Sequence, residues 1–254
     1  MPIAKNEPLI AGYPTLLFGF YKGMYDLVSH LVEHHHYQKI GYISGPEQSS
    51  SIRDRFQAYR DVLRDHAIPY DDNLVVTGSI FAPSGAEAVQ TFLDERRLKL
   101  GTDLQVIVGL NDYIAIDTLK ALQARGIRIP DELAIVGFDD DESAFSTNPQ
   151  LTTVRLPTYE IGRWGIDTLV SLLEGQAVPE ITTIPAKLVV RRSCGCLGHL
   201  LAQSAMINGD QVYQDAPEIP LQQRRDELLA MIWNSAGFQR IPRLFQDVEA
   251  FVDT

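Results

Sequence analysis

Several short apolar runs of this chain are followed by polar residues that could bind a small molecule. Ser49 and Arg55 follow the apolar run at residues 39–44, and two further runs lead into Asn111 and Asp139. Carboxylate and amide oxygens accept hydrogen bonds from hydroxyl groups, while a guanidinium donates them through a rigid fork. This combination suits a polyhydroxylated ligand such as a sugar, because each hydroxyl can be matched by a complementary group.

The same residues could instead have purely structural roles. Asn111 and the acidic run at residues 139–141 are of the types that cap helix N-termini. Arg55 could form an exposed ion pair with Asp54 or Glu47, which would contribute little to stability. The residue types alone leave both interpretations open.

Catalytic signatures are missing from the sequence. It contains no G-x-S-x-G nucleophile elbow, no G-x-x-x-x-G-K-[ST] phosphate loop and no G-x-G-x-x-G after an apolar run. The acidic run at residues 139–141 could ligate a cation such as Mg²⁺, but it suits a helix N-terminus equally well. We therefore expect a binding protein that is not an enzyme and uses no cofactor.

Two groups of soft metal ligands also occur. His30 precedes the histidine run at residues 34–36 by one helical turn, and Cys194 and Cys196 lie close to His199. Neither group has the ligand number and spacing of a familiar Cys/His zinc site. We expect a solvated helix end, two free thiols and no metal site.

The elements that must position these residues alternate regularly along the chain. Short apolar runs are separated by segments with apolar residues at helical spacing, such as Met24, Leu27, Val28 and Leu31. Repeated strand–helix units of this kind predict an α/β fold with a parallel sheet, right-handed crossovers and helices on both faces. The predicted strands cover residues 14–18, 39–44, 74–76, 106–108, 133–138, 151–154 and 184–190.

Composition limits the partners. The chain has 254 residues and a formal net charge of −11, which disfavours direct binding to nucleic acid. No apolar run is long enough to span a bilayer, and residues 1–7 lack the apolar core of a signal peptide. We expect a cytoplasmic chain without membrane contact. We expect residues 1–196 to form the ligand-binding domain, 197–218 a polar linker, and 219–254 a helical extension.

Taken together, the ordered motifs between residues 13 and 196 resemble the ligand-sensing domain of the lactose/galactose-repressor (LacI/GalR) family, which shares its fold with type I periplasmic sugar-binding proteins. The residues that carry the resemblance are 39–46 (KIGYISGP), 55–59 (RFQAY), 111–112 (ND), 129–140 (IPDELAIVGFDD), 151–155 (LTTVR) and 191–196 (RRSCGC).

The resemblance implies a type I periplasmic-binding-protein-like domain whose two lobes close on a sugar-like effector. By motif position, Arg55, Asn111 and Asp139 match residues that hydrogen-bond the effector in that family. Ile80 or Phe81 falls where the family often places an aromatic side chain against the ligand. These residues, with Ser49, form the predicted ligand site.

The resemblance also implies a transcriptional regulator that works as a homodimer. The family's helix-turn-helix and the first strand–helix units of its N-terminal lobe have no counterpart here, so we expect one nearly complete lobe and a remnant of the other. A sensor followed by extra helices also resembles the front part of some histidine kinases and diguanylate cyclases, which is the alternative assignment.

Overall fold

The computed structural model describes residues 13–46 and 48–196, so the predicted linker at 197–218 and helical extension at 219–254 lie outside the described residues. Its strands are β1 (Thr15–Phe18), β2 (Ile40–Ser44), β3 (Val75–Thr77), β4 (Val106–Gly109), β5 (Ala134–Val136), β6 (Thr153–Arg155), β7 (Ile181–Ile184) and β8 (Lys187–Val189). Its helices are α1 (Phe20–His35), α2 (Ser50–Asp65), α3 (Ser84–Gln90), α4 (Asp112–Ala124), α5 (Glu142–Phe145) and α6 (Thr158–Leu173), with short turns of helix at Asp72–Leu74 and Thr91–Glu95.

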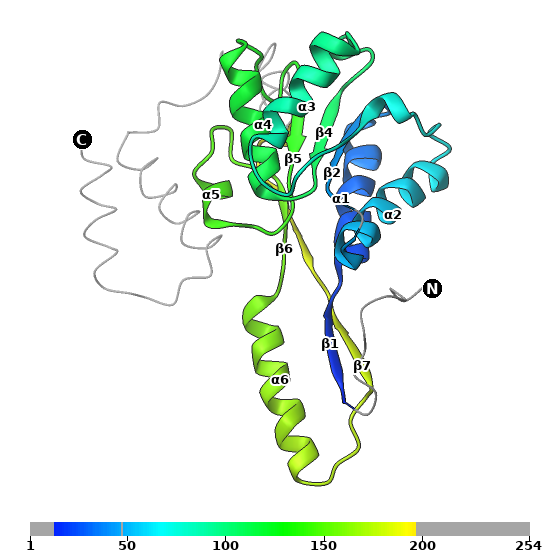
Figure 1. The fold of residues 1–254 in the computed structure, drawn as a ribbon, viewed down its shortest axis with the longest axis vertical. Helices are drawn as coiled ribbons and strands as arrows, with labels where there is room; N and C mark the ends of the chain where they lie inside the picture. The colour runs from blue at the N-terminus through cyan, green and yellow to red at the C-terminus, as the bar shows by residue number, and fades with distance from the viewer. Residues whose placement is uncertain (1–12, 47, 197–254) are drawn as a thin grey trace, which may run out of the picture. The chain divides into compact units, whose positions relative to one another are not determined.

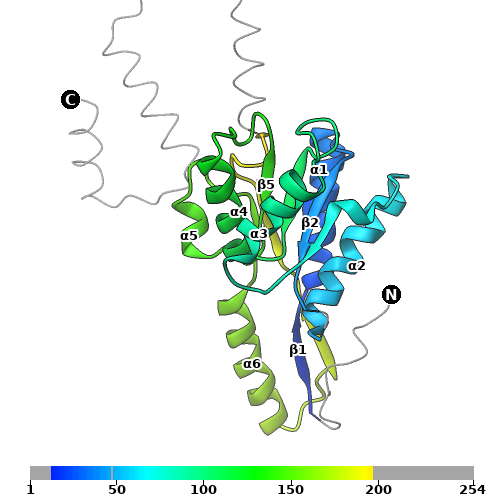
Figure 2. The ribbon, with the colours of Figure 1, turned by 45° about the horizontal axis from the view of Figure 1, so that its top comes forward.

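A four-stranded sheet forms the centre of the domain. Its strand order is β3-β2-β4-β5, and every neighbouring pair is parallel. Helices α1 and α2 pack together on one face and α3 and α4 on the other, as Figures 1 and 2 show. The prediction of an α/β fold with a parallel sheet covered on both faces is therefore confirmed for this part of the chain.

The strands are buried on both faces, and the side chains alternate between two cores. In β2, Tyr42 contributes to the core under α1 and α2, while the next residue, Ile43, contributes to the core under α3 and α4. Strand β4 alternates in the same way between Val106 and Ile107. This alternation is the two-residue period of a strand, and it explains why these segments are apolar throughout.

Helix α1 buries one face against the sheet. Its buried residues include Met24, Leu27, Val28 and Leu31, the residues whose spacing predicted the helix. Gly23 allows a particularly close approach, because a Cβ there would lie 2.8 Å from Cγ1 of Val154 and 2.9 Å from Cβ of Ala186.

The remaining strands form two small ladders. β1 pairs in parallel with β7, and β6 pairs antiparallel with β8. The single strand predicted at residues 184–190 was therefore wrong, because the chain changes partner between Ile184 and Lys187. Pro185 lies between the two segments and cannot donate a ladder hydrogen bond, which favours the break.

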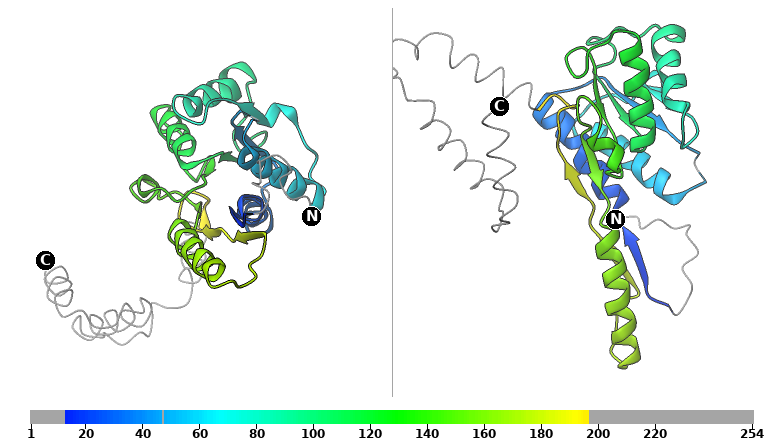
Figure 3. Two further views of the ribbon diagram at one scale, coloured as in Figure 1. Left: turned by 60° about the horizontal axis from the view of Figure 1, so that its bottom comes forward. Right: turned by 90° about the vertical axis from the view of Figure 1, so that its left-hand side faces the viewer.

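Helix α6 lies beside β1 and has no buried residue, although it is strongly apolar (Figures 1 and 3). Leu169 is 61% exposed and Leu173 is 88% exposed. The described residues thus leave much of the apolar face of α6 exposed. Across residues 13–46 and 48–196, no helix combines the length and apolar character needed to cross a membrane.

Candidate functional site

The carboxyl ends of β2, β4 and β5 meet at one edge of the sheet, where open parallel sheets bind their ligands. Arg55 reaches this edge from the second turn of α2 and is only 7% exposed. Its Nη1 donates a hydrogen bond of 2.8 Å to the backbone oxygen of Leu110, directly after β4. Its guanidinium also packs 4.8 Å from the ring centroid of Phe138. The alternative of an exposed ion pair does not hold for Arg55.

Asp139 faces this guanidinium from the end of β5. Its Oδ1 lies 3.9 Å from Nη1 of Arg55, which is an ion pair too long for a direct hydrogen bond. Within the described part of the chain, no hydrogen bond to the Asp139 carboxylate is found, and its side chain is 36% exposed. Burial raises the pKa of Asp139 to about 6, partly offset by the charge of Arg55. The carboxylate thus retains open hydrogen-bonding capacity beside a fixed cation.

The backbone at this position is unusual. Asp139 has φ of +111°, which residues other than glycine rarely adopt, and Asp140 has φ of +56°, in the left-handed region that aspartate enters more often than most residues. Such residues cost about 1–3 kcal/mol and are concentrated at functional sites. The backbone nitrogen of Asp139 donates to Val154, which holds the strand end in place.

Asn111 is the N-cap of α4, as the structural alternative predicted. Its Oδ1 accepts a hydrogen bond of 2.9 Å from the backbone nitrogen of Ile114, and its Nδ2 donates one of 3.0 Å to the backbone oxygen of Ile80. Asn111 therefore ties the loop after β3 to the end of β4. Each polar atom makes one hydrogen bond, so the amide keeps a second N–H and Oδ1 a second lone pair for a ligand.

The other predicted site residues lie at the surface. Ile80 is 37% exposed and Phe81 is 59% exposed. The ring of Phe81 lies 6.5 Å from that of Tyr113, which extends from the first turn of α4. Ser49 is exposed, and its Oγ lies 2.8 Å from Oγ of Ser51. The part of these residues in ligand binding stays a prediction.

Asp112 was missed as a site residue, although it follows Asn111 directly. It is fully buried, and its carboxylate accepts hydrogen bonds from Oγ1 of Thr153 at 2.6 Å and from the backbone nitrogen of Asp141 at 2.9 Å. Burial raises the pKa of Asp112 to about 7, opposed by these two hydrogen bonds. Asp112 thus positions the loop that carries Asp139, and a carboxylate beside a predicted N-cap was its signal in the sequence.

The remaining acidic residues of the run have partners within the protein. Asp140 is almost buried and pairs with Nε of Arg155 and Nη2 of Arg191, each at 2.6 Å. Asp141 caps α5 through the backbone nitrogen of Ser143. These contacts separate the three carboxylates, so the run does not converge into a cation site in the described residues.

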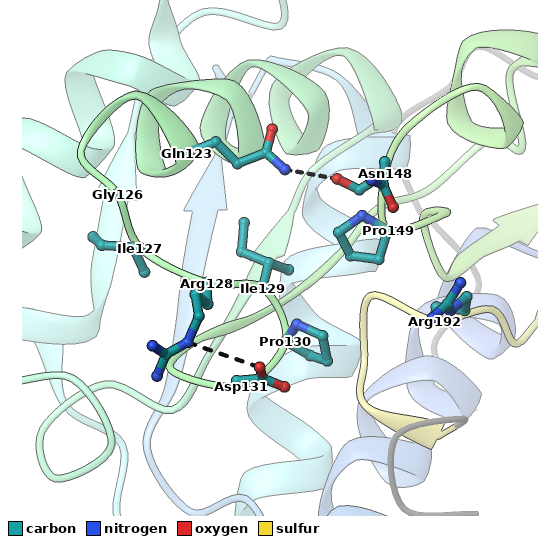
Figure 4. Close-up of a pocket in the computed structure, with 10 residues that line it drawn as sticks. All are labelled: Gln123, Gly126, Ile127, Arg128, Ile129, Pro130, Asp131, Asn148, Pro149 and Arg192. Atoms are coloured by element: carbon teal, nitrogen blue, oxygen red, sulfur yellow. Dashed lines mark hydrogen bonds and ion pairs between the residues drawn. The ribbon is translucent and has the colours of Figure 1, made fainter. Parts of the chain in front are cut away.

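A surface pocket of about 580 Å³ lies elsewhere, at the segments that precede β5 and β6 (Figure 4). Figure 4 shows Gln123 donating to the backbone oxygen of Asn148 across one side of it, and Arg128 beside Asp131 on another. These segments enter the strands at the opposite edge of the sheet from Arg55 and Asp139. The pocket is therefore separate from the predicted ligand site.

The motifs and the fold are shared with known proteins. A family model described as "Periplasmic binding protein-like domain" matches residues 28–194, about two thirds of the chain. The chain belongs to the periplasmic binding protein-like domain family. The predicted resemblance to the sensing domain of LacI-type regulators is confirmed by relatives that match the same region.

The HTH-type transcriptional regulator AscG of Escherichia coli is 31% identical over 169 residues, which cover 66% of this chain and 48% of AscG. A crystal structure of the ascG repressor aligns with a TM-score of 0.63 over 69% of this chain and 62% of that one. A CelR–cellobiose complex aligns with 28% identity and a TM-score of 0.63, over 71% and 54% of the two chains. A lac repressor dimer bound to operator aligns with 28% identity and a TM-score of 0.63, over 70% and 59%. This periplasmic binding protein-like domain spans about half the length of the curated relative.

Proposed function

We propose that this chain is the effector-sensing domain of a LacI/GalR-type transcriptional regulator and binds a sugar or similar small polyhydroxylated metabolite. The observation that carries the proposal is the pairing of Arg55 and Asp139. The guanidinium is buried and fixed, and the carboxylate 3.9 Å away has unused acceptor capacity. A ligand hydroxyl could donate to Asp139 while a neighbouring oxygen accepts from Arg55.

The relatives support this assignment. CelR is described in complex with cellobiose, and AscG is an HTH-type regulator. By this analogy, effector binding shifts an equilibrium between two arrangements of the sensing domain, and the ligand acts by binding one of them more tightly. The signalling alternative, a sensor of a histidine kinase or diguanylate cyclase, is not favoured by these relatives.

Several finer properties belong to the proposal. The lac repressor in the aligned structure is a dimer on operator DNA, and we propose that this chain also functions as a homodimer in the cytoplasm. With a net charge of −11, it is proposed to make no direct contact with nucleic acid. The proposed role is binding rather than catalysis, and it needs no cofactor.

A thermal-shift screen tests the proposal. The chain is heated with monosaccharides, disaccharides including cellobiose, and nucleosides, and positive compounds are titrated by calorimetry. A ligand at about 100 times its Kd stabilises the folded state by about 2.7 kcal/mol, which raises Tm by roughly 5–10 °C for a domain of this size.

Two matched variants locate the binding. Asp139→Asn keeps the shape of the side chain and removes its charge, so we expect affinity to fall by about tenfold or more. Asp131→Asn makes the same change at a side chain that is 71% exposed, beside the pocket of Figure 4, and should bind like the parent chain. If no compound raises Tm, or if Asp139→Asn binds as tightly as Asp131→Asn, the proposed function is wrong.

A further inference from the structure

Four side chains that the effector site does not use come together at the carboxyl end of α1. His30 and His35 lie on the last two turns of that helix, whereas Cys194 and Cys196 follow β8, near the end of the described sequence. Their ligand atoms all lie within 4.8 Å of one another. Both cysteines are free thiols. In the described residues this is the one group of histidine, cysteine and carboxylate ligands that could hold a metal ion.

The distances match a tetrahedral site. Sγ of Cys196 lies 3.2 Å from Nε2 of His30, 3.1 Å from Nε2 of His35 and 3.4 Å from Sγ of Cys194. Sγ of Cys194 lies 3.8 Å from Nε2 of His30. Zinc bonds of about 2.3 Å to sulfur and 2.0–2.1 Å to nitrogen would separate tetrahedral ligands by about 3.3–3.8 Å. In a zinc site each of these four distances would change by about 0.5 Å or less. The other two pairs, from His35 to His30 and to Cys194, lie within 4.8 Å and would shorten by at most about 1.5 Å.

We propose that His30, His35, Cys194 and Cys196 bind one structural Zn²⁺ ion. Two thiolates and two imidazoles in tetrahedral arrangement are the ligand set of structural zinc sites, and soft thiolates select zinc over hard cations. All four positions are filled by the protein, so the site leaves no open position for catalysis.

The surroundings hold the ligands in place. The ring of His35 stacks on Tyr37 at 5.3 Å, and the hydroxyl of Tyr37 donates to the backbone oxygen of Cys194 at 3.2 Å. The hydroxyl of Thr152 donates to Sγ of Cys194, also at 3.2 Å. Such contacts behind the ligands orient them towards the centre of the cluster.

Gly195 makes the turn between the two cysteines possible. Its φ is +102°, a conformation that other residues rarely adopt, and its backbone nitrogen donates to Arg192. The turn brings both sulfur atoms to the same side, facing α1.

The zinc site would cross-link distant parts of the chain. The histidines and the cysteines are more than 150 positions apart, and a bond that closes such a long loop restricts the unfolded chain strongly. In the sequence, the histidine group and the cysteine group each lacked ligands for a complete zinc site, and no metal was predicted because the two groups were considered separately. The proposal replaces that expectation.

Zinc binding to the full chain tests the proposal. The protein is kept reduced with a phosphine, stripped with a chelator, and titrated with Zn²⁺ against a chromophoric competitor. We expect about one zinc ion per chain and a higher Tm in its presence. Co²⁺ in place of zinc should give the visible bands of tetrahedral coordination together with a thiolate-to-metal charge-transfer band.

Variants distinguish the site from adventitious binding. Cys196→Ser and His35→Gln should each lower zinc affinity by at least about tenfold. His34→Gln alters an exposed histidine next to His35 and should bind zinc like the parent chain. The proposal is overturned if the reduced parent chain binds no zinc, if its Co²⁺ form lacks the thiolate band, or if all three variants bind equally. The cobalt spectrum of the parent chain decides the matter even if a variant does not fold.

Discussion

The buried carboxyl group of Asp112 should make the stability of the domain depend on pH in a direction opposite to that of an ordinary ion-paired aspartate. Its pKa is raised from 3.8 to about 7, chiefly by burial. Below both values the group is protonated in the folded and unfolded states. Between them the folded state keeps the proton that the unfolded state has lost, so the free energy of unfolding falls as the pH rises.

The size of this effect follows from the two pKa values. Each tenfold difference in proton affinity corresponds to about 1.4 kcal/mol, so the difference between 3.8 and about 7 corresponds to about 4 kcal/mol. The contribution of Asp112 should therefore make the free energy of unfolding about 4 kcal/mol lower at pH 8 than at pH 3. Asp139, with a pKa raised to about 6, acts in the same direction but is more exposed and contributes less.

The comparison of the parent chain with Asp112→Asn isolates this contribution, because an amide does not titrate. Urea unfolding is measured at several pH values between 4 and 8. The parent chain should lose up to about 4 kcal/mol more than the variant over this range. Asp131→Asn, at an exposed position, should follow the parent. Parallel pH profiles for the parent chain and Asp112→Asn would refute the reasoning, since the carboxyl group would then titrate alike in both states.

Two further perturbations probe the packing of the fold. A Cβ at Gly85 would lie 2.5 Å from the backbone nitrogen of Thr118, so Gly85→Ala should lower the free energy of unfolding in urea by about 1–3 kcal/mol. A Cβ at Gly162 would have nothing within 4 Å, so Gly162→Ala should leave stability unchanged or raise it by up to about 1 kcal/mol. Equal effects of the two changes would contradict the packing of α3 on α4. The exposed apolar face of α6 should bind a hydrophobic fluorescent dye, and the double change Leu169→Glu with Leu173→Glu should reduce that fluorescence; an unchanged signal would mean that the dye binds elsewhere.

The local pattern of apolar residues was sufficient to predict most strands of the central sheet. Tyr42 and Ile43 alternate between two cores, and the resulting continuous apolar run identified β2 without knowledge of its neighbours. The C-terminal ladders could not be predicted in this way. Residues 181–189 are divided between β7 and β8 because the first part pairs with β1 and the second with β6. The pairing partner of a strand is not indicated by the spacing of its own apolar residues.

The candidate site was predicted in the same uneven way. Arg55 and Asp139 could be named because residues at the carboxyl ends of parallel strands meet at one sheet edge. The role of Asp112 was missed, because its position beside the N-cap does not show that Thr153 and the loop around Asp141 bury its carboxylate; only the folded chain brings these residues together.

The sequence by itself determined the α/β class and the set of polar residues available at the strand ends, since both depend on short-range periodicity. Only the tertiary structure decided what those residues contact. It fixed Arg55 against Leu110 and opposite Asp139, and it brought His30 and His35 to the two cysteines. The physical reason is that burial and ligand geometry are properties of contacts between distant segments, which no local pattern encodes.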